Sequence, residues 1–131
     1  MQVEKIIFVC AGNMNRSPTA ERVFKQLCRE NDLSFIVSSA GTNALEERRQ
    51  FTKEDAKEYD VFFALDSEVE EKLRFNYHIS KDKIHNLNIA DEFSGRGLDD
   101  LIPVLRQRLM PYVEDLKTGN NLMRRKYKRF L

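Results

Sequence analysis

Residues 3–27 read VEKIIFVCAGNMNRSPTAERVFKQL, and this stretch decides the fold. Residues 3–9 are largely β-branched and aromatic, and they stop at polar, glycine-containing sequence, which is typical of a strand buried on both faces of a parallel sheet. From Ala20 onward, apolar residues recur at the spacing of one helical face. Pro18 suits the beginning of a helix, where its missing N–H leaves no hydrogen bond unmade. The pattern predicts a strand, a loop and a helix, in that order.

The loop of this unit has the properties of an anion site. A short connection from a strand into a helix points successive backbone N–H groups at one place, and the helix N-terminus adds a positive partial charge there. We therefore expect the loop to hold inorganic phosphate, sulfate or a phosphate ester. The residues predicted to bind it are Ala11, Gly12, Asn13, Met14, Asn15, Arg16 and Ser17.

Cys10 and Arg16 indicate the chemistry of the loop. Cys10 opens it, so the donors that would bind an anion would also stabilise a thiolate, which activates the nucleophile without a histidine. Arg16 can bind two phosphate oxygens through its planar guanidinium, a geometry that lysine lacks. Gly12 permits a tight path, Asn13 can hold unusual dihedral angles, and Ser17 can donate a hydrogen bond to the sulfur. These residues predict a cysteine-dependent phosphomonoester hydrolase.

The rest of the chain alternates apolar runs of strand length with helical patterns. This alternation predicts an α/β fold of three αβα layers, in which a parallel sheet is covered by helices on both faces. The expected strands are 35–39, 60–65 and 83–89. The first expected helix is capped by Thr52 and Asp55, and the second by Asp66 or Ser67. The third covers residues 98–116, with a kink at Pro111. The sequence shows no repeats, and we expect one domain over residues 1–117 and a basic tail over residues 118–131.

Four segments, in order, resemble the low-molecular-weight protein tyrosine phosphatase family. They are FVCAGNMNRSPTAE, SSAGT, RQFTKED and DVFFALD, which begin at residues 8, 38, 49 and 60. The resemblance continues to about Leu116. It implies a four-stranded parallel sheet with the phosphate-binding loop after the first strand. It also implies Cys10 as nucleophile, Arg16 as phosphate clamp, and Ser17, Asn13 and Ser39 as supporting hydrogen-bonding residues.

The same resemblance implies a general acid from a later loop, where relatives carry Asp followed by Pro and an aromatic residue. The matching stretch here is IADEF, residues 89–93. Asp91 is thus the implied acid, and Phe93 is either a core residue or an aromatic wall of the substrate cleft. Glu92 stands in place of the proline, so Glu92 remains the alternative acid. The connection between Thr42 and Phe51 is short, and a segment that walls the cleft in relatives is largely missing, so we expect a more open cleft.

The expected substrate is a phosphotyrosine-containing protein or a small aryl phosphate, cleaved through a phosphocysteine intermediate. A cysteine at the floor of a cleft is reached best by a long aryl ester, and Met14 offers its ring an apolar contact. A phosphoarginine phosphatase is the nearest alternative, since relatives with that activity carry a small hydroxyl residue at the loop position that Met14 holds here. The other alternative is a binding module that depends on phosphate and does not turn it over. The mechanism requires no metal and no organic cofactor.

Composition limits the partners and the compartment. A net charge of +1 from 22 basic and 21 acidic residues gives no overall field toward nucleic acid or membrane, and the five positive charges within residues 123–130 are typical of a solvated tail. Two cysteines without metal-ligand spacing favour a reducing compartment, and without a signal segment or membrane span we expect a cytoplasmic protein.

Cys28 lies on the apolar side of its helix and is expected in the core, whereas His78 and His85 are expected at the surface or at an edge.

Overall fold

The computed structural model describes residues 3–45, 47–89 and 98–118. It confirms the predicted α/β fold. The elements in chain order are β1 (Lys5–Cys10), α1 (Arg16–Glu30), β2 (Ile36–Gly41), α2 (Lys53–Glu58), β3 (Val61–Ala64), α3 (Ser67–Phe75), a 3-10 turn (Lys81–Lys83), β4 (Ile84–Asn86) and α4 (Leu98–Thr118). The strands form a four-stranded sheet in the order β2-β1-β3-β4, and every neighbouring pair is parallel.

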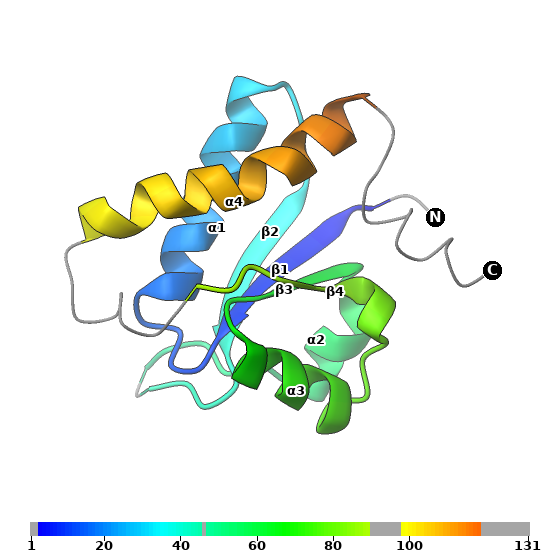
Figure 1. Cartoon of the computed structure of the whole chain (residues 1–131). Coiled ribbons are helices and arrows are strands. Elements are labelled where there is room, and N and C mark those ends of the chain that lie inside the picture. The colour runs from blue at the N-terminus through cyan, green and yellow to red at the C-terminus, as the bar shows by residue number, and fades with distance from the viewer. Residues whose placement is uncertain (1–2, 46, 90–97, 119–131) are drawn as a thin grey trace.

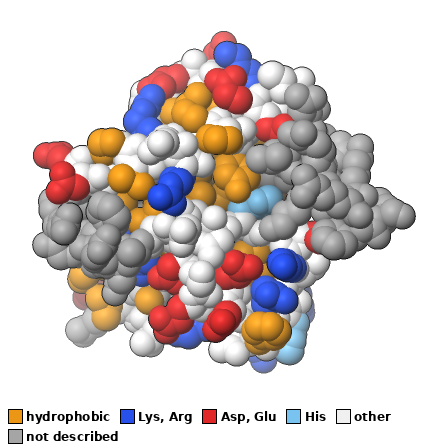
Figure 2. Space-filling view, in the orientation of Figure 1, with side chains coloured by type: hydrophobic (Ala, Val, Ile, Leu, Met, Phe, Trp, Pro, Cys, Tyr) orange, Lys and Arg blue, Asp and Glu red, His pale blue; other side chains and the backbone are white. Residues whose placement is uncertain are grey.

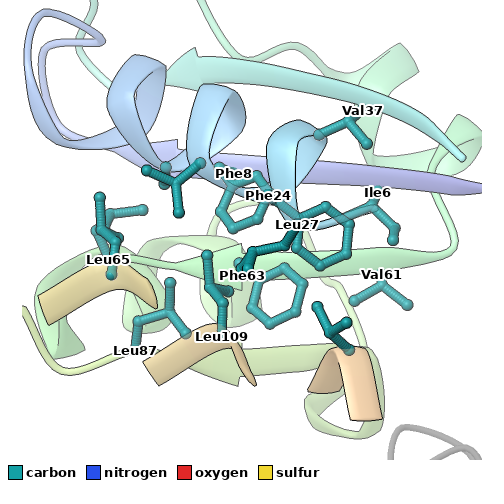
Figure 3. Close-up of a cluster of buried hydrophobic side chains, with 14 of the residues drawn as sticks. Ile6, Phe8, Phe24, Leu27, Val37, Val61, Phe63, Leu65, Leu87 and Leu109 are labelled. Carbon is teal, nitrogen blue, oxygen red and sulfur yellow. The ribbon is translucent and has the colours of Figure 1, made fainter. Parts of the chain in front are cut away.

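Helices cover both faces of the sheet, as predicted (Figure 1). Helices α1 and α4 lie on one face, and α2 and α3 lie on the other. The strand residues alternate between the two cores: Phe8 packs in the core under α1 and α4, whereas Ile7 packs in the core under α2 and α3. The rings of Phe8 and Phe63 stack with centroids 4.8 Å apart, and Phe24 of α1 packs against both (Figure 3).

The element boundaries differ from the predicted ones around the loop, at β4, which is shorter than the predicted strand 83–89, and at the end of the chain. Helix α1 begins at Arg16, two residues before Pro18, and Pro18 still lies among the first four helical residues, whose N–H groups have no partner within the helix. Strand β2 runs on to Gly41. Helix α4 continues through Pro103 and Pro111 to Thr118. Residues 119–131, most of the predicted tail, lie outside the described residues.

The two histidines differ. His78 is exposed, as predicted. His85 lies on the edge strand β4 but is buried, so a surface position for it is wrong. Its ring packs between Phe63 and Tyr112, at centroid distances of 5.7 Å and 5.1 Å, because α4 covers the side of the edge strand that an isolated edge would expose.

Cys28 is buried in the core on α1, as predicted. Burial raises the pKa of the Cys28 thiol to about 11, so the thiol is neutral at physiological pH and is a poor nucleophile.

The surface carries both signs of charge on the face in view (Figure 2). In the described ranges, no helix combines the length and the hydropathy needed to cross a bilayer.

Candidate active site

The loop between β1 and α1 lies at the carboxyl edge of the sheet (Figure 1). Cys10 is the last residue of β1 and is 2% exposed. Its sulfur accepts a hydrogen bond from the Asn13 backbone N–H at 3.2 Å and lies 2.9 Å from the hydroxyl oxygen of Ser17. The sulfur thus lies among hydrogen-bond donors at the beginning of a helix, where an anion can also bind. The arrangement therefore suits a nucleophilic cysteine.

Asn13 holds the loop in a left-handed turn. Its φ is 54°, a conformation that asparagine tolerates better than most residues with a side chain. Its amide nitrogen donates to the hydroxyl oxygens of Ser17 at 3.0 Å and Ser39 at 3.2 Å. Its amide oxygen accepts from the backbone N–H of Arg49 at 3.2 Å. The buried Asn13 side chain thus connects the loop to α1, to β2 and to the segment before α2.

The loop passes close to β2 at Gly41. A Cβ atom at position 41 would lie 2.5 Å from the carbonyl oxygen of Ala11 and 2.9 Å from the backbone nitrogen of Asn13. These are backbone atoms of the loop, so they could move only by changing its path. At Gly12, by contrast, a Cβ would meet only the side chain of Leu45, at 3.3 Å. The sequence pointed to Gly12 for the tight path, whereas the close approach in the structure is at Gly41.

We expect Gly41→Ala to displace the loop and to weaken the binding of inorganic phosphate by about tenfold or more. The added methyl group should also lower the free energy of unfolding by about 1–3 kcal/mol, the range typical of overpacking. Calorimetric titration with phosphate and thermal denaturation measure both effects. Gly12→Ala is the matched control and should be milder in both measurements, and equal effects of the two substitutions would contradict the close approach at Gly41.

Arg16, the first residue of α1, is 3% exposed and held in a fixed orientation. Its Nη1 donates to Oδ2 of Asp66 at 2.7 Å and to the carbonyl oxygen of Ile89 at 3.1 Å. Asp66 is itself fixed, because its other oxygen caps α3 by accepting from the Val69 N–H at 2.9 Å. Charge-assisted hydrogen bonds of this kind set the plane of a guanidinium. The arginine is therefore oriented before any anion arrives.

The sequence and fold comparisons agree with this geometry. Residues 5–49 match the family model described as low molecular weight phosphotyrosine protein phosphatase. The pig protein of that name is 34% identical over 90 residues, which cover 50% of this chain and 57% of the pig protein. A protein tyrosine phosphatase from Entamoeba histolytica superposes with a TM-score of 0.74 at 25% identity, covering 89% of this chain and 99% of that one. The chain thus resembles the low molecular weight phosphotyrosine protein phosphatases over residues 5–49, and its fold is similar to that of the Entamoeba structure. The resemblance noted in the sequence is thereby confirmed.

The proteins that this chain resembles include more than one named activity. A protein-arginine-phosphatase from Bacillus subtilis is 51% identical over 39 residues, which cover 30% of this chain and 26% of that protein. The chain thus matches little more than half the length of the pig protein and about a quarter of the Bacillus protein. The residues matched by the family model, 5–49, include the loop.

The structure brings most of the predicted site residues together. Cys10, Asn13, Ser17 and Ser39 are joined by the hydrogen bonds described above, and Arg16 begins the helix that follows the loop. The remaining loop residues are Ala11, Gly12, Met14 and Asn15, of which Met14 is 46% exposed. Asp91, Glu92 and Phe93 lie outside the described residues, so their roles remain predictions.

The short connection after β2 runs alongside the loop. The backbone N–H groups of Thr42, Asn43 and Leu45 donate to the carbonyl oxygens of residues 10, 11 and 12, at 2.9, 2.9 and 3.2 Å. This pairing places Leu45 beside Gly12, with 49% of its surface exposed. Leu45 and Met14 are therefore two exposed apolar side chains at the rim of the loop.

Sequence reasoning missed three groups of the candidate site, namely the Asp66 carboxylate, the Ile89 carbonyl and Arg49. Asp66 had a usable signal, because it lies two residues after β3, whose carboxyl end lies beside that of β1. Arg49 donates to the Ser39 carbonyl at 3.2 Å and to Oδ1 of Asp55 at 2.6 Å, and it had no signal that distinguished it from Arg48. Among the described residues, no group of three or more His, Cys, Asp or Glu side chains could hold a metal ion.

Proposed function

We propose that the protein hydrolyses phosphate monoesters through a phosphocysteine at Cys10. The observation that carries the proposal is the loop itself, with a buried sulfur hydrogen-bonded at the N-terminus of a helix whose first residue is a buried, oriented arginine. Backbone N–H groups and Arg16 would bind the three equatorial oxygens of the phosphoryl group and stabilise the charge of the transition state. Hepes, which carries a sulfonate, occupies the active site of the Entamoeba relative.

The reaction has two steps. The Cys10 sulfur attacks phosphorus in line, a sulfur–phosphorus bond forms, and the bond to the ester oxygen breaks while Asp91 gives that oxygen a proton. The Asp91 carboxylate then takes a proton from a water molecule, whose oxygen attacks phosphorus and releases phosphate. The sulfur leaves as a thiolate, and the Ser17 hydroxyl, 2.9 Å away, stabilises it.

For the substrate we propose phosphotyrosine or a small aryl phosphate. Met14 and Leu45 give the loop an apolar rim, which suits an aromatic ring better than the charged guanidino group of phosphoarginine. Phosphoarginine is the competing substrate, because the Bacillus relative is a protein-arginine-phosphatase.

Phosphate release from phosphotyrosine and phosphoarginine peptides of identical sequence tests the assignment. We expect a higher kcat/KM on phosphotyrosine, and the reverse order would assign the protein to the arginine phosphatases. Phosphate binding without turnover of either peptide would make the protein a binding module.

Asp91→Asn tests the proposed general acid. The substitution keeps the size of the side chain but removes the proton donor, so the rate on phosphotyrosine should fall by at least about 10²-fold, as for other positioned acids. p-Nitrophenyl phosphate has a better leaving group and should be affected less. Glu92→Gln is the matched control. A silent Asp91→Asn combined with a large loss in Glu92→Gln would move the acid to Glu92.

A further inference from the structure

The segment after β4 carries the carbonyl group that holds Arg16. The Leu87 N–H donates to the Ala64 carbonyl at 2.9 Å, and the Ile89 N–H donates to the Leu65 carbonyl at 2.7 Å, so the segment continues along β3. The Ile89 carbonyl then accepts from Arg16 Nη1 at 3.1 Å. The position of Ile89 therefore decides where one acceptor of the guanidinium lies.

Asn88 makes a left-handed turn between these two contacts. Its φ is 55°. The Asn86 side-chain oxygen accepts from the Asn88 N–H at 2.7 Å, and the Asn86 amide nitrogen donates to Ser67 and Glu70 of α3, each at 3.1 Å. Helix α3 thus supports the turn from one side through Asn86.

Arg108 of α4 supports the same turn from the other side. Its Nη1 donates to the carbonyl oxygens of both Leu87 and Asn88, the second at 3.0 Å. We propose that Arg108 is a positioning residue for Arg16: it holds the carbonyls on both sides of the turn and so fixes the Ile89 carbonyl that orients the guanidinium. The inference rests on the proposed function, since Arg16 is the proposed phosphate clamp.

Arg106 offers a matched control on the same helix. Its Nη2 pairs with Oε1 of Glu30 on α1 at 3.0 Å, and both side chains are substantially exposed. An exposed pair of this kind contributes little to stability. Arg106 and Arg108 thus share residue type and helix, but Arg108 hydrogen-bonds to the turn that leads to Arg16, whereas Arg106 pairs with Glu30.

Arg108→Met keeps the aliphatic stem and removes both donors. We expect inorganic phosphate to bind about tenfold more weakly by calorimetric titration, in proportion to the two lost hydrogen bonds. We also expect the Ile89 amide to exchange its hydrogen faster in NMR experiments, a readout of its position on β3. Arg106→Met should change neither quantity. Equal phosphate affinity and equal Ile89 exchange in the two variants would overturn the inference.

Substitutions at Asn88 give a second test without touching the arginine. Asn88→Ala should weaken phosphate binding in the same direction, because alanine disfavours the left-handed conformation, whereas Asn88→Gly should stay close to wild type. Equal affinities in Asn88→Ala and Asn88→Gly would count against the role of the turn. A wild-type protein that does not bind phosphate would refute the proposed function instead, and Ile89 exchange in Arg108→Met would still test the role of Arg108.

Discussion

Cys10→Ser is expected to lower kcat by about 10⁴–10⁶-fold, the scale seen when a catalytic nucleophile is removed. A serine hydroxyl is not ionised at neutral pH, so the attacking group is lost while the backbone cradle and Arg16 remain. Phosphate should therefore still bind, with an affinity close to that of the wild type. Steady-state kinetics on p-nitrophenyl phosphate and calorimetric titration with phosphate measure the two effects separately.

Cys28→Ala is the control for the other cysteine. Cys28 is buried in the core, and burial raises its thiol pKa to about 11, so its removal should lower stability and leave kcat unchanged. Turnover near the wild-type level in Cys10→Ser would rule out covalent catalysis by Cys10.

Arg16→Lys is expected to lower kcat/KM by about 10³-fold or more, the range for an arginine that stabilises the charge of a phosphoryl transition state. Lysine keeps the positive charge but cannot bind two oxygens in one plane. It is also shorter, so the buried contacts to Asp66 and the Ile89 carbonyl would be lost together. We expect both weaker phosphate binding and a lower kcat.

Arg22→Lys is a suitable control, because Arg22 lies on the same helix and its Nη2 contacts Thr19 of α1 at 3.4 Å. It should behave like the wild type. If Arg16→Lys kept its kcat and lost only stability, Arg16 would shape the loop without binding the phosphoryl group.

The parts of the site that are local in sequence could be predicted from sequence. Strand β1, the loop and α1 are contiguous, so the apolar run before Cys10 and the helical spacing after Pro18 were sufficient to place Cys10, Asn13 and Arg16 around one point. The parallel sheet followed from the alternation of strand and helix patterns. Ser39 came from the resemblance to the family, not from its own pattern.

The distant supports of the site could not be predicted in the same way. Asp66 and Ile89 lie 50 and 73 residues from Arg16, and only the strand order β2-β1-β3-β4 brings them to the same edge. The need for glycine at position 41 likewise depends on how closely two strands and a loop approach in space. The burial of His85 depends on where α4 packs, which its own neighbours in sequence do not specify.

Rapid quenching of the reaction with an aryl phosphate tests the central claim most directly. The account predicts a burst of aryl alcohol that approaches one equivalent per protein, together with a phosphoryl group that mass spectrometry of the acid-quenched protein locates on Cys10. The Cys10→Ser variant should show neither the burst nor the adduct. Rapid turnover by the wild type with no phosphoryl group on Cys10 at any time before steady state would contradict the account. Solvent oxygen would then reach the phosphate in a single displacement.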